Sequence, residues 1–270
     1  MKTFDPSTYQ AKKRFGQNFL HDNSIIDRIV KSIRVKADDN VIEIGPGLGA
    51  ITKQILPITG EINVIELDRD IIPKLKFNCD GLGNLNILQT DALKVDYQVF
   101  AEKGPLRVVG NLPYNISTPL LFKLFEFLPS IKDMHFMLQK EVVMRMCAMP
   151  GSKTYGRLSV MTQSVCEARL LFLVPPESFT PAPKVDSAIV YLAPRKEPLN
   201  IKDQSLFSAV VTEAFNQRRK TLRNVWRNRI SAENLEALGI NPTLRPENVS
   251  LEDFVRVANH ISLSEGAKAN

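Results

Sequence analysis

The residues with the clearest capacity for chemistry form the run Asn111-Leu112-Pro113-Tyr114. The side-chain amide of Asn111 can accept and donate hydrogen bonds, and the carbonyl of Leu112 is left free because Pro113 has no N–H. Tyr114 adds an aromatic face. Together these groups suit a flat base that carries an exocyclic amine. An ordinary strand-to-loop turn with a packed tyrosine is the alternative that four residues alone leave open.

A glycine-rich turn is a second candidate site. A hydrophobic strand predicted at residues 41–44 runs into residues 45–49, whose spacing is G-x-G-x-G, and glycine lets the backbone approach a ligand closely. Glu66 follows the next predicted strand and stands 21 residues after Gly45, an interval typical of a carboxylate that binds ribose hydroxyls. A cofactor containing adenosine is therefore predicted. A nicotinamide dinucleotide and S-adenosylmethionine both qualify, but the spacing differs from the G-x-G-x-x-G that packs against a pyrophosphate.

Polar residues follow each of four successive predicted strands. Asp91 comes after the third strand, where it is a helix cap by default and can also bond an adenine amine. Asn111 comes after the fourth. Because the carboxyl ends of parallel strands meet at one edge of a sheet, Gly45, Glu66, Asp91 and Asn111 are predicted to lie together.

The elements that must position these residues form an open α/β fold. An amphipathic helix over residues 25–33 can be capped by Asp22 or Asn23. Further helices are predicted at residues 119–128 and 158–165, and the strands at residues 41–44, 62–65, 85–89, 106–109, 134–138, 169–174 and 188–192.

A proline-containing loop at residues 179–187 precedes the last of these strands. Pro181 and Pro183 fix its backbone in an extended form, so Phe179 is held in place. Phe179 is a candidate wall of the site, with a plug of the hydrophobic core as the alternative.

The composition limits the classes of protein. The chain has 270 residues, 44% hydrophobic and 24% charged, which suits one α/β domain with a smaller appendage. Its cysteines, Cys79, Cys147 and Cys166, show neither a disulfide framework nor zinc-ligand spacing, so no metal is predicted. No apolar run approaches the ~20 residues of a membrane span. We therefore expect a cytoplasmic protein with no membrane partner.

The net charge of +6 is concentrated in two segments. Clusters of this kind track a phosphate backbone, and Phe15, Phe19 and Trp226 near them offer stacking surfaces for bases. A solvated charged face is the alternative. The clusters comprise residues 12–14 and, in the second segment, Arg218, Arg219, Lys220, Arg223, Arg227 and Arg229.

Beyond residue 200 the pattern is helical. Apolar residues at positions 206, 207, 210, 211, 214 and 215 share one helix face, and the basic run is predicted to continue that helix. Residues 235–240 and 251–261 add further candidates. The pattern predicts a domain of residues 1–199 and a small helical domain of residues 200–270, with a first domain that folds without the second.

The motifs, in this order, resemble the bacterial small-subunit (16S) ribosomal RNA adenine dimethyltransferase family over nearly the whole chain. The resemblance implies a Rossmann-like class I methyltransferase sheet with a small all-helical C-terminal domain. It also implies methyl transfer from S-adenosylmethionine to the 6-amino groups of two adjacent adenosines near the 3′ end of small-subunit rRNA. It rests on residues 17–20, 43–49, 66–68, 90–92, 111–117, 179–187 and 215–220.

The same resemblance implies which residues bind the cofactor. Asn18 and Leu20 would close over S-adenosylmethionine, and Gly45 would approach it through its backbone. Glu66 would hold the ribose hydroxyls, and Asp91 would meet the adenine ring.

The resemblance implies catalytic roles as well. Asn111, which also borders the cofactor, and the Leu112 carbonyl would orient the target amine. Tyr114, with Phe179 on the opposite side, would stack on the extruded base.

Three rival functions remain open at this point. One is a related methyltransferase that acts on large-subunit rRNA and confers antibiotic resistance, and another is a non-catalytic RNA-binding assembly factor. A nicotinamide-dependent oxidoreductase is the third, and the glycine spacing disfavours it. The expected partner is small-subunit rRNA in the assembling 30S subunit, and a monomer is expected because no long coiled coil is evident.

Overall fold

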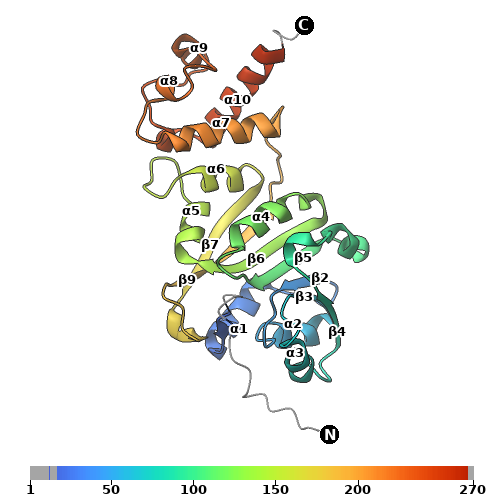
Figure 1. Ribbon diagram of the computed structural model, residues 1–270. Helices are drawn as coiled ribbons and strands as arrows, with labels where there is room; N and C mark the ends of the chain where they lie inside the picture. Colours follow the sequence, from blue (N-terminus) through green and yellow to red (C-terminus); the bar gives the residue numbers. More distant parts are fainter. Residues whose placement is uncertain (1–11, 13–16, 267–270) are drawn as a thin grey trace. The chain divides into compact units, whose positions relative to one another are not determined.

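Hydrophobic runs of the chain form a central sheet in the computed structural model, which describes residue 12 and residues 17–266. Among these residues the sheet has seven strands in the order β4-β3-β2-β5-β6-β9-β7 (Figure 1). Every predicted strand is present, and each extends beyond its apolar run because backbone pairing continues into the polar flanks. The strands are β2 Asn40–Ile44, β3 Glu61–Glu66, β4 Asn84–Gln89, β5 Leu106–Asn111, β6 Ile131–Gln139, β7 Cys166–Val174 and β9 Ser187–Pro194.

The strands from β2 to β6 are parallel, and β9 is antiparallel to β6. Their register pairs Glu66 with Gln89 and Asn111 with Met137. Parallel pairing places the carboxyl ends of β2, β3, β4 and β5 at one edge of the sheet, as the sequence predicts. A separate two-stranded ladder joins β1 Phe19–Leu20 to β8 Phe179–Thr180.

Helices α1, α2 and α3 bury apolar residues against one face of the sheet. Ile26 of α1, Ile55 of α2 and Leu75 of α3 share a buried cluster with Val41 and Val64. Among residues 17–266 no helix has the length and apolar character needed to cross a membrane. The helices are α1 Asn23–Ile33, α2 Thr52–Thr59, α3 Ile72–Asn78, α4 Ser117–Phe125, α5 Lys140–Met146, α6 Arg157–Gln163, α7 Gln204–Asn216, α8 Leu222–Val225, α9 Ala232–Ala237 and α10 Leu251–Gly266, with short 3₁₀ turns at η3 Ala92–Lys94, η4 Tyr97–Lys103, η5 Leu128–Ser130, η6 Pro176–Ser178 and η7 Pro246–Asn248.

A buried ion-pair network fixes the amino-terminal ends of β5 and β6. Arg107 donates through Nε and Nη2 to Asp133 at 3.0 and 2.8 Å and through Nη1 to Asp39 at 2.7 Å. Burial alone would raise the pKa of Asp39, but hydrogen bonds from Lys132 and Arg107 hold that pKa at about 2. Burial lowers the pKa of the neighbouring His135 to about 4, so its imidazole is neutral at neutral pH.

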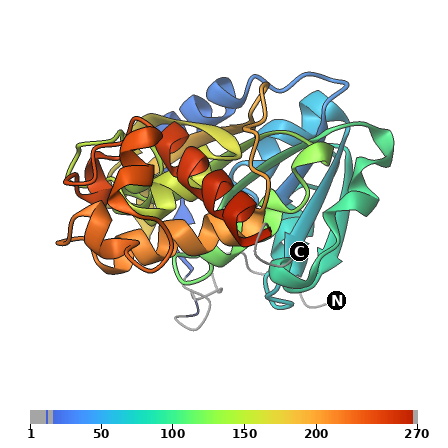
Figure 2. The same cartoon turned by 90° about the horizontal axis from the view of Figure 1, so that it is seen from above.

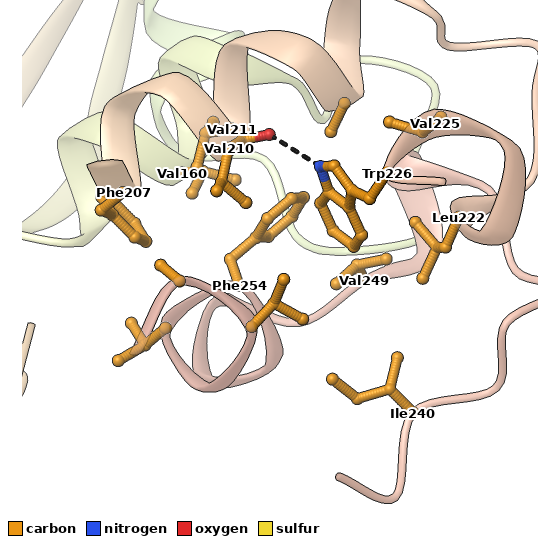
Figure 3. Packing of buried hydrophobic residues seen from close by; sticks show 14 of the residues in the cluster. Val160, Phe207, Val210, Val211, Leu222, Val225, Trp226, Ile240, Val249 and Phe254 are labelled. Atoms are coloured by element: carbon orange, nitrogen blue, oxygen red, sulfur yellow. Dashed lines mark hydrogen bonds between the residues drawn. The ribbon is translucent and has the colours of Figure 1, made fainter. Parts of the chain in front are cut away.

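The chain divides into two compact units. The first comprises the chain through Val143 together with Arg169–Pro194, and the second comprises Met144–Ala168 together with the chain from Arg195 onward. This differs from the predicted division at residue 200, because α6 lies in the helical unit. The helix formed by residues 157–163 carries Val160 into the same core as Phe207 and Phe254 (Figure 3).

Trp226 belongs to the core of the second unit. Its side chain is fully buried, and its indole Nε1 donates to the carbonyl of Val210 at 3.2 Å (Figure 3). Helices α7 and α10 lie side by side around this core (Figures 1 and 2). The predicted role of Trp226 as a stacking surface for bases is therefore wrong.

The basic run does not continue α7. That helix ends at Asn216, and a turn closed by the bond from Lys220 N to the Gln217 carbonyl at 2.8 Å separates it from α8. Arg229 chelates the carboxylate of Glu213, with Nε and Nη2 contacts of 2.7 to 3.0 Å. The predicted continuation of the helix through the basic run is thus wrong, although five of the six cations remain exposed. These are Arg218, Arg219, Lys220, Arg223 and Arg227.

Truncation after Pro198 tests the division into units. The first domain was expected to fold without residues 200–270, but the cut removes the core partners of Val160 and the Val249 carbonyl that accepts from the Tyr155 hydroxyl at 3.0 Å. We expect the truncated chain to aggregate or to melt well below the full chain in differential scanning calorimetry, because buried apolar groups become exposed. A truncated chain that melts cooperatively at the temperature of the full chain would contradict this expectation.

Candidate active site

A cavity of about 310 Å³ lies at the carboxyl edge of the sheet, within the first unit. Its walls come from the N-terminal segment, the glycine-rich turn, the ends of β3 and β4, and the turn after β5. The lining residues are 17–20, 43–48, 50–51, 65–67, 90–92 and 111–116. We call this space the strand-end cavity.

The glycine-rich turn brings backbone to the wall of the strand-end cavity. Gly45 has a φ of 69° and donates its N–H to the Ile65 carbonyl at 2.9 Å, which ties the turn to β3. Gly47 has a φ of 55°, and a Cβ there would stand 3.3 Å from the ring of Phe19. Both positions therefore favour glycine, because an L side chain is strained at these φ values, and both residues line the strand-end cavity with backbone alone.

Glu66 supplies a buried carboxylate to the strand-end cavity. The residue is 7% exposed, and its carboxylate accepts the backbone N–H of Asp68 at 2.8 Å and of Gly47 at 3.4 Å. Burial raises the pKa of Glu66, against the hydrogen bonds that lower it. A carboxylate has about four acceptor positions and the backbone N–H groups do not fill them all, so capacity remains for a ligand hydroxyl.

Asp91 combines the two roles that the sequence left open. One of its carboxylate oxygens caps η3 by accepting the N–H of Leu93 at 3.0 Å. The residue also lines the strand-end cavity. Capping fixes the side chain and leaves the other oxygen available to a ligand amine.

Glu43 is a cavity residue that our sequence reasoning missed. It is 2% exposed and accepts a hydrogen bond from Thr52 Oγ1 at 2.5 Å. Burial raises the pKa of Glu43 to about 7, the Thr52 hydrogen bond lowers it and the nearby Glu66 raises it. The sequence did carry a signal for this residue, because Glu43 is a carboxylate within an otherwise apolar strand. A carboxylate is rarely buried in a strand unless it has a specific partner.

The run from Asn111 to Tyr114 also lines the strand-end cavity, next to Gly45, because β5 neighbours β2 in the sheet. Asn111 Nδ2 donates to the carbonyl of Asn18 at 3.1 Å, which orients the amide. Leu112 N donates to the Met137 carbonyl at 3.2 Å, whereas no described residue donates to the Leu112 carbonyl. The Tyr114 hydroxyl hydrogen-bonds with Ser187 Oγ at 2.8 Å. Two acceptors and one ring are therefore presented together.

The N-terminal segment closes one side of the cavity. Residues 17–20 line it, and Leu20 pairs with Phe179 in the β1–β8 ladder, where the sequence predicted only a loop. Phe179 itself is 3% exposed and packs in the core cluster that contains Leu20. The structure thus brings every predicted site residue to the cavity except Phe179, which occupies the core as in the alternative interpretation.

The first basic cluster is only partly described. Lys12 Nζ contacts carboxylate oxygens of Asp68 at 2.8 Å and Asp70 at 2.6 Å, and Gln17 Nε2 donates to Asp68 at 3.1 Å. Lys12 is therefore paired with carboxylates beside the cavity. Together with the Gln17 bond, these contacts hold residues 17–20 against the cavity. The predictions for Lys13, Arg14 and Phe15 fall outside the described residues.

Similarity to known proteins extends over nearly the whole chain. The sequence profile of the family Ribosomal RNA adenine dimethylase matches residues 8–263. The chain is 54% identical over 252 residues to the Ribosomal RNA small subunit methyltransferase A of Marinobacter nauticus. The aligned region covers 93% of this chain and 91% of the relative.

Two solved structures are similar across the fold. A dimethyladenosine transferase from Plasmodium falciparum superposes with a TM-score of 0.80 at 27% identity, covering 92% of this chain and 98% of that one. The 23S rRNA methyltransferase ErmE superposes with a TM-score of 0.71 at 25% identity, covering 91% of this chain and 100% of that one.

The raised pKa of Glu43 predicts a pH-dependent stability. Between the ordinary pKa of 4.5 and the folded-state pKa of about 7, the unfolded chain releases a proton that the folded chain retains, so stability falls as pH rises through this window. Glu43→Gln keeps an acceptor for Thr52 and removes the charge. Urea unfolding should show the variant more stable than wild type at pH 8 by on the order of 3 kcal/mol, with little difference near pH 4.

The exposed carboxylate Glu102 offers the matched control, and Glu102→Gln should follow the wild-type pH profile. If the stability of Glu43→Gln relative to wild type is the same at both pH values, the raised pKa assigned to the buried Glu43 is wrong.

Proposed function

Because the chain belongs to the ribosomal RNA adenine dimethylase family, we propose that it transfers methyl groups from S-adenosylmethionine to the 6-amino groups of two adjacent adenosines near the 3′ end of small-subunit rRNA. One observation carries the proposal for the site. Asn111 Nδ2 donates to the Asn18 carbonyl, which leaves Oδ1 as an acceptor, and the carbonyl of the next residue, Leu112, receives no donor from the described residues. Two acceptors in one place suit an amino group with two N–H bonds.

The residues of the strand-end cavity fit the methyl donor. Glu66 would accept the ribose hydroxyls, Asp91 would accept the adenine amine, and Gly45 would present its backbone. Asn18 and Leu20 would cover the bound molecule from the N-terminal side. The backbone lining at the glycine turn and the buried Glu66 carboxylate in the same cavity support this assignment. Bound S-adenosylmethionine supplies a sulfonium methyl group that is open to displacement.

The protein's part in the transfer is to hold the target amine in line with that methyl group. An adenine amine is a poor nucleophile because its lone pair is delocalised into the ring. Asn111 Oδ1 and the Leu112 carbonyl would each accept one N–H, which fixes the direction of the lone pair and favours the positive charge that develops on nitrogen. Tyr114 would stack on the extruded base.

Phe179 receives a different role from the one the sequence suggested. Its side chain packs behind Leu20 in the core, so we assign base stacking to Tyr114 alone. Phe179 would instead support Leu20, which lines the cavity.

The RNA side of the proposal rests on exposed cations. Arg219, Lys220, Arg223 and Arg227 would contact phosphates of the small subunit. Arg229 leaves this set because Glu213 binds it, and Arg218 because it donates to the Lys153 carbonyl at 2.7 Å and lies 3.8 Å from Glu247. We further propose that the protein acts in the cytoplasm as a monomer on the assembling 30S particle. The 54% identity with a small-subunit enzyme, against 25% with ErmE, supports the small-subunit substrate over the large-subunit rival.

The direct test incubates the protein with labelled S-adenosylmethionine and small subunits that lack these methyl groups, followed by mass spectrometry of the rRNA. We expect two adjacent dimethyladenosines near the 3′ end. A parallel incubation with naked large-subunit RNA that places the methyl groups there instead, or no methyl groups on either RNA, would refute the proposed substrate.

Loss of the Glu66 carboxylate should weaken donor binding. Glu66→Ala removes a charged acceptor for two hydroxyls, which is worth about 2 kcal/mol, or roughly a 30-fold rise in the Kd for S-adenosylmethionine. Isothermal titration calorimetry measures it. Glu61, at the other end of β3, is the control, and Glu61→Ala should bind like wild type. Equal affinities for Glu66→Ala and Glu61→Ala would exclude Glu66 from the donor site.

Loss of the Asn111 amide should affect catalysis more than binding. Asn111→Ala removes an acceptor for the target amine, so kcat should fall by about 100-fold or more while the Kd for S-adenosylmethionine changes little. Single-turnover assays on small subunits provide the rate. Asn86→Ala, which removes a β4 amide that donates to Glu61 of β3, should keep the wild-type rate. A wild-type rate in Asn111→Ala would disprove the orienting role.

A further inference from the structure

Ser187 makes a contact with the stacking residue that the proposed reaction does not yet use. Its Oγ lies 2.8 Å from the Tyr114 hydroxyl. Ser187 is fully buried, begins β9 and is paired with Gln139, the last residue of β6. The hydrogen bond therefore runs from the turn after β5, past the end of β6, to the start of β9.

Ser187 is itself held rigidly. The backbone N–H of Lys140 donates to the Asp186 carbonyl at 2.9 Å, and Lys140 Nζ contacts the Asp186 carboxylate at 2.9 Å. Together with the pairing of Ser187 and Gln139, these bonds fix the backbone on both sides of the serine. The Ser187 hydroxyl is thus an anchor on the sheet rather than on a free loop.

Tyr114 is anchored at its backbone end as well. Ser117, which is 2% exposed, donates through Oγ to the Tyr114 carbonyl at 3.1 Å. Ile116 N donates to the Pro113 carbonyl at 3.1 Å and closes the turn. The two serines therefore fasten opposite ends of the tyrosine, and only the face of its ring remains to meet a ligand.

We propose that Ser187 is a positioning residue that fixes the ring of Tyr114 in the orientation that receives the target adenine. A stacked ring pair has a preferred separation and offset. A tyrosine ring that is anchored at just one end also samples orientations that would displace the base from the methyl group. The proposal rests on the proposed function, since the adenine is the substrate named there. It adds a residue from β9 to the site.

A double-mutant cycle tests this inference. Tyr114→Phe and Ser187→Ala each delete the same hydrogen bond and keep the aromatic ring, and the double variant deletes nothing further. Each single variant should lower kcat on small subunits by roughly fivefold to tenfold, the scale of one neutral hydrogen bond. The double variant should be no slower than the singles, and the Kd for S-adenosylmethionine should be unchanged in all three.

Two controls separate positioning from general weakening of the fold. Ser187→Thr keeps the hydroxyl and should recover the rate relative to Ser187→Ala. Ser130, which is 8% exposed and bonds Gln98 through Oγ at 2.5 Å, lies just before β6 at the other end of that strand. Ser130→Ala loses a comparable hydrogen bond and should keep the wild-type kcat.

Several results would overturn the inference. A wild-type kcat in Ser187→Ala, multiplied losses in the double variant, or a weakened donor affinity that parallels the loss of rate would each show that the bond only stabilises the fold. These results differ from a failure of the proposed function, in which the unaltered protein itself would not methylate small subunits.

Discussion

Parallel pairing of β2, β3, β4 and β5 is the constraint on which the site depends. A different cavity-lining residue stands at or just after the end of each strand. These residues meet at one edge only because the strands run in the same direction. The buried Arg107 network fastens the opposite edge, where β5 and β6 begin. The Arg107 network thus stabilises the sheet at the edge away from the strand-end cavity.

The two walls of the strand-end cavity are built by different means. The wall of Gly45 and Glu66 uses backbone that lacks side chains and a carboxylate held in a low-dielectric setting. The wall of Asn111 and Tyr114 uses side chains that are each oriented by one hydrogen bond, to the Asn18 carbonyl and to Ser187. Small changes in those two bonds should therefore affect reaction geometry before they affect donor binding.

The sequence predicted the strands and the strand-end residues because period and turn chemistry are local properties. It did not predict the state of Glu43, whose pKa depends on burial against Thr52, or the position of Phe179, which the β1–β8 ladder decides. Trp226 illustrates the same limit, because a basic neighbourhood in sequence placed it on a surface while tertiary packing buries it. The helical unit differs from the predicted domain for a similar reason, since residues distant in sequence share its core.

The central claim is that one cavity receives the donor and the target adenine together, in line. A bisubstrate analogue, in which a short alkyl linker joins the 6-nitrogen of adenosine to the atom that replaces the sulfonium sulfur of an S-adenosylmethionine analogue, in place of the transferred methyl group, tests it by calorimetry. We expect binding at least ~10-fold tighter than that of the donor half alone, with the gain lost in Asn111→Ala, because linking removes the cost of a second association. An analogue that binds no better than its donor half, at every linker length, would contradict the account.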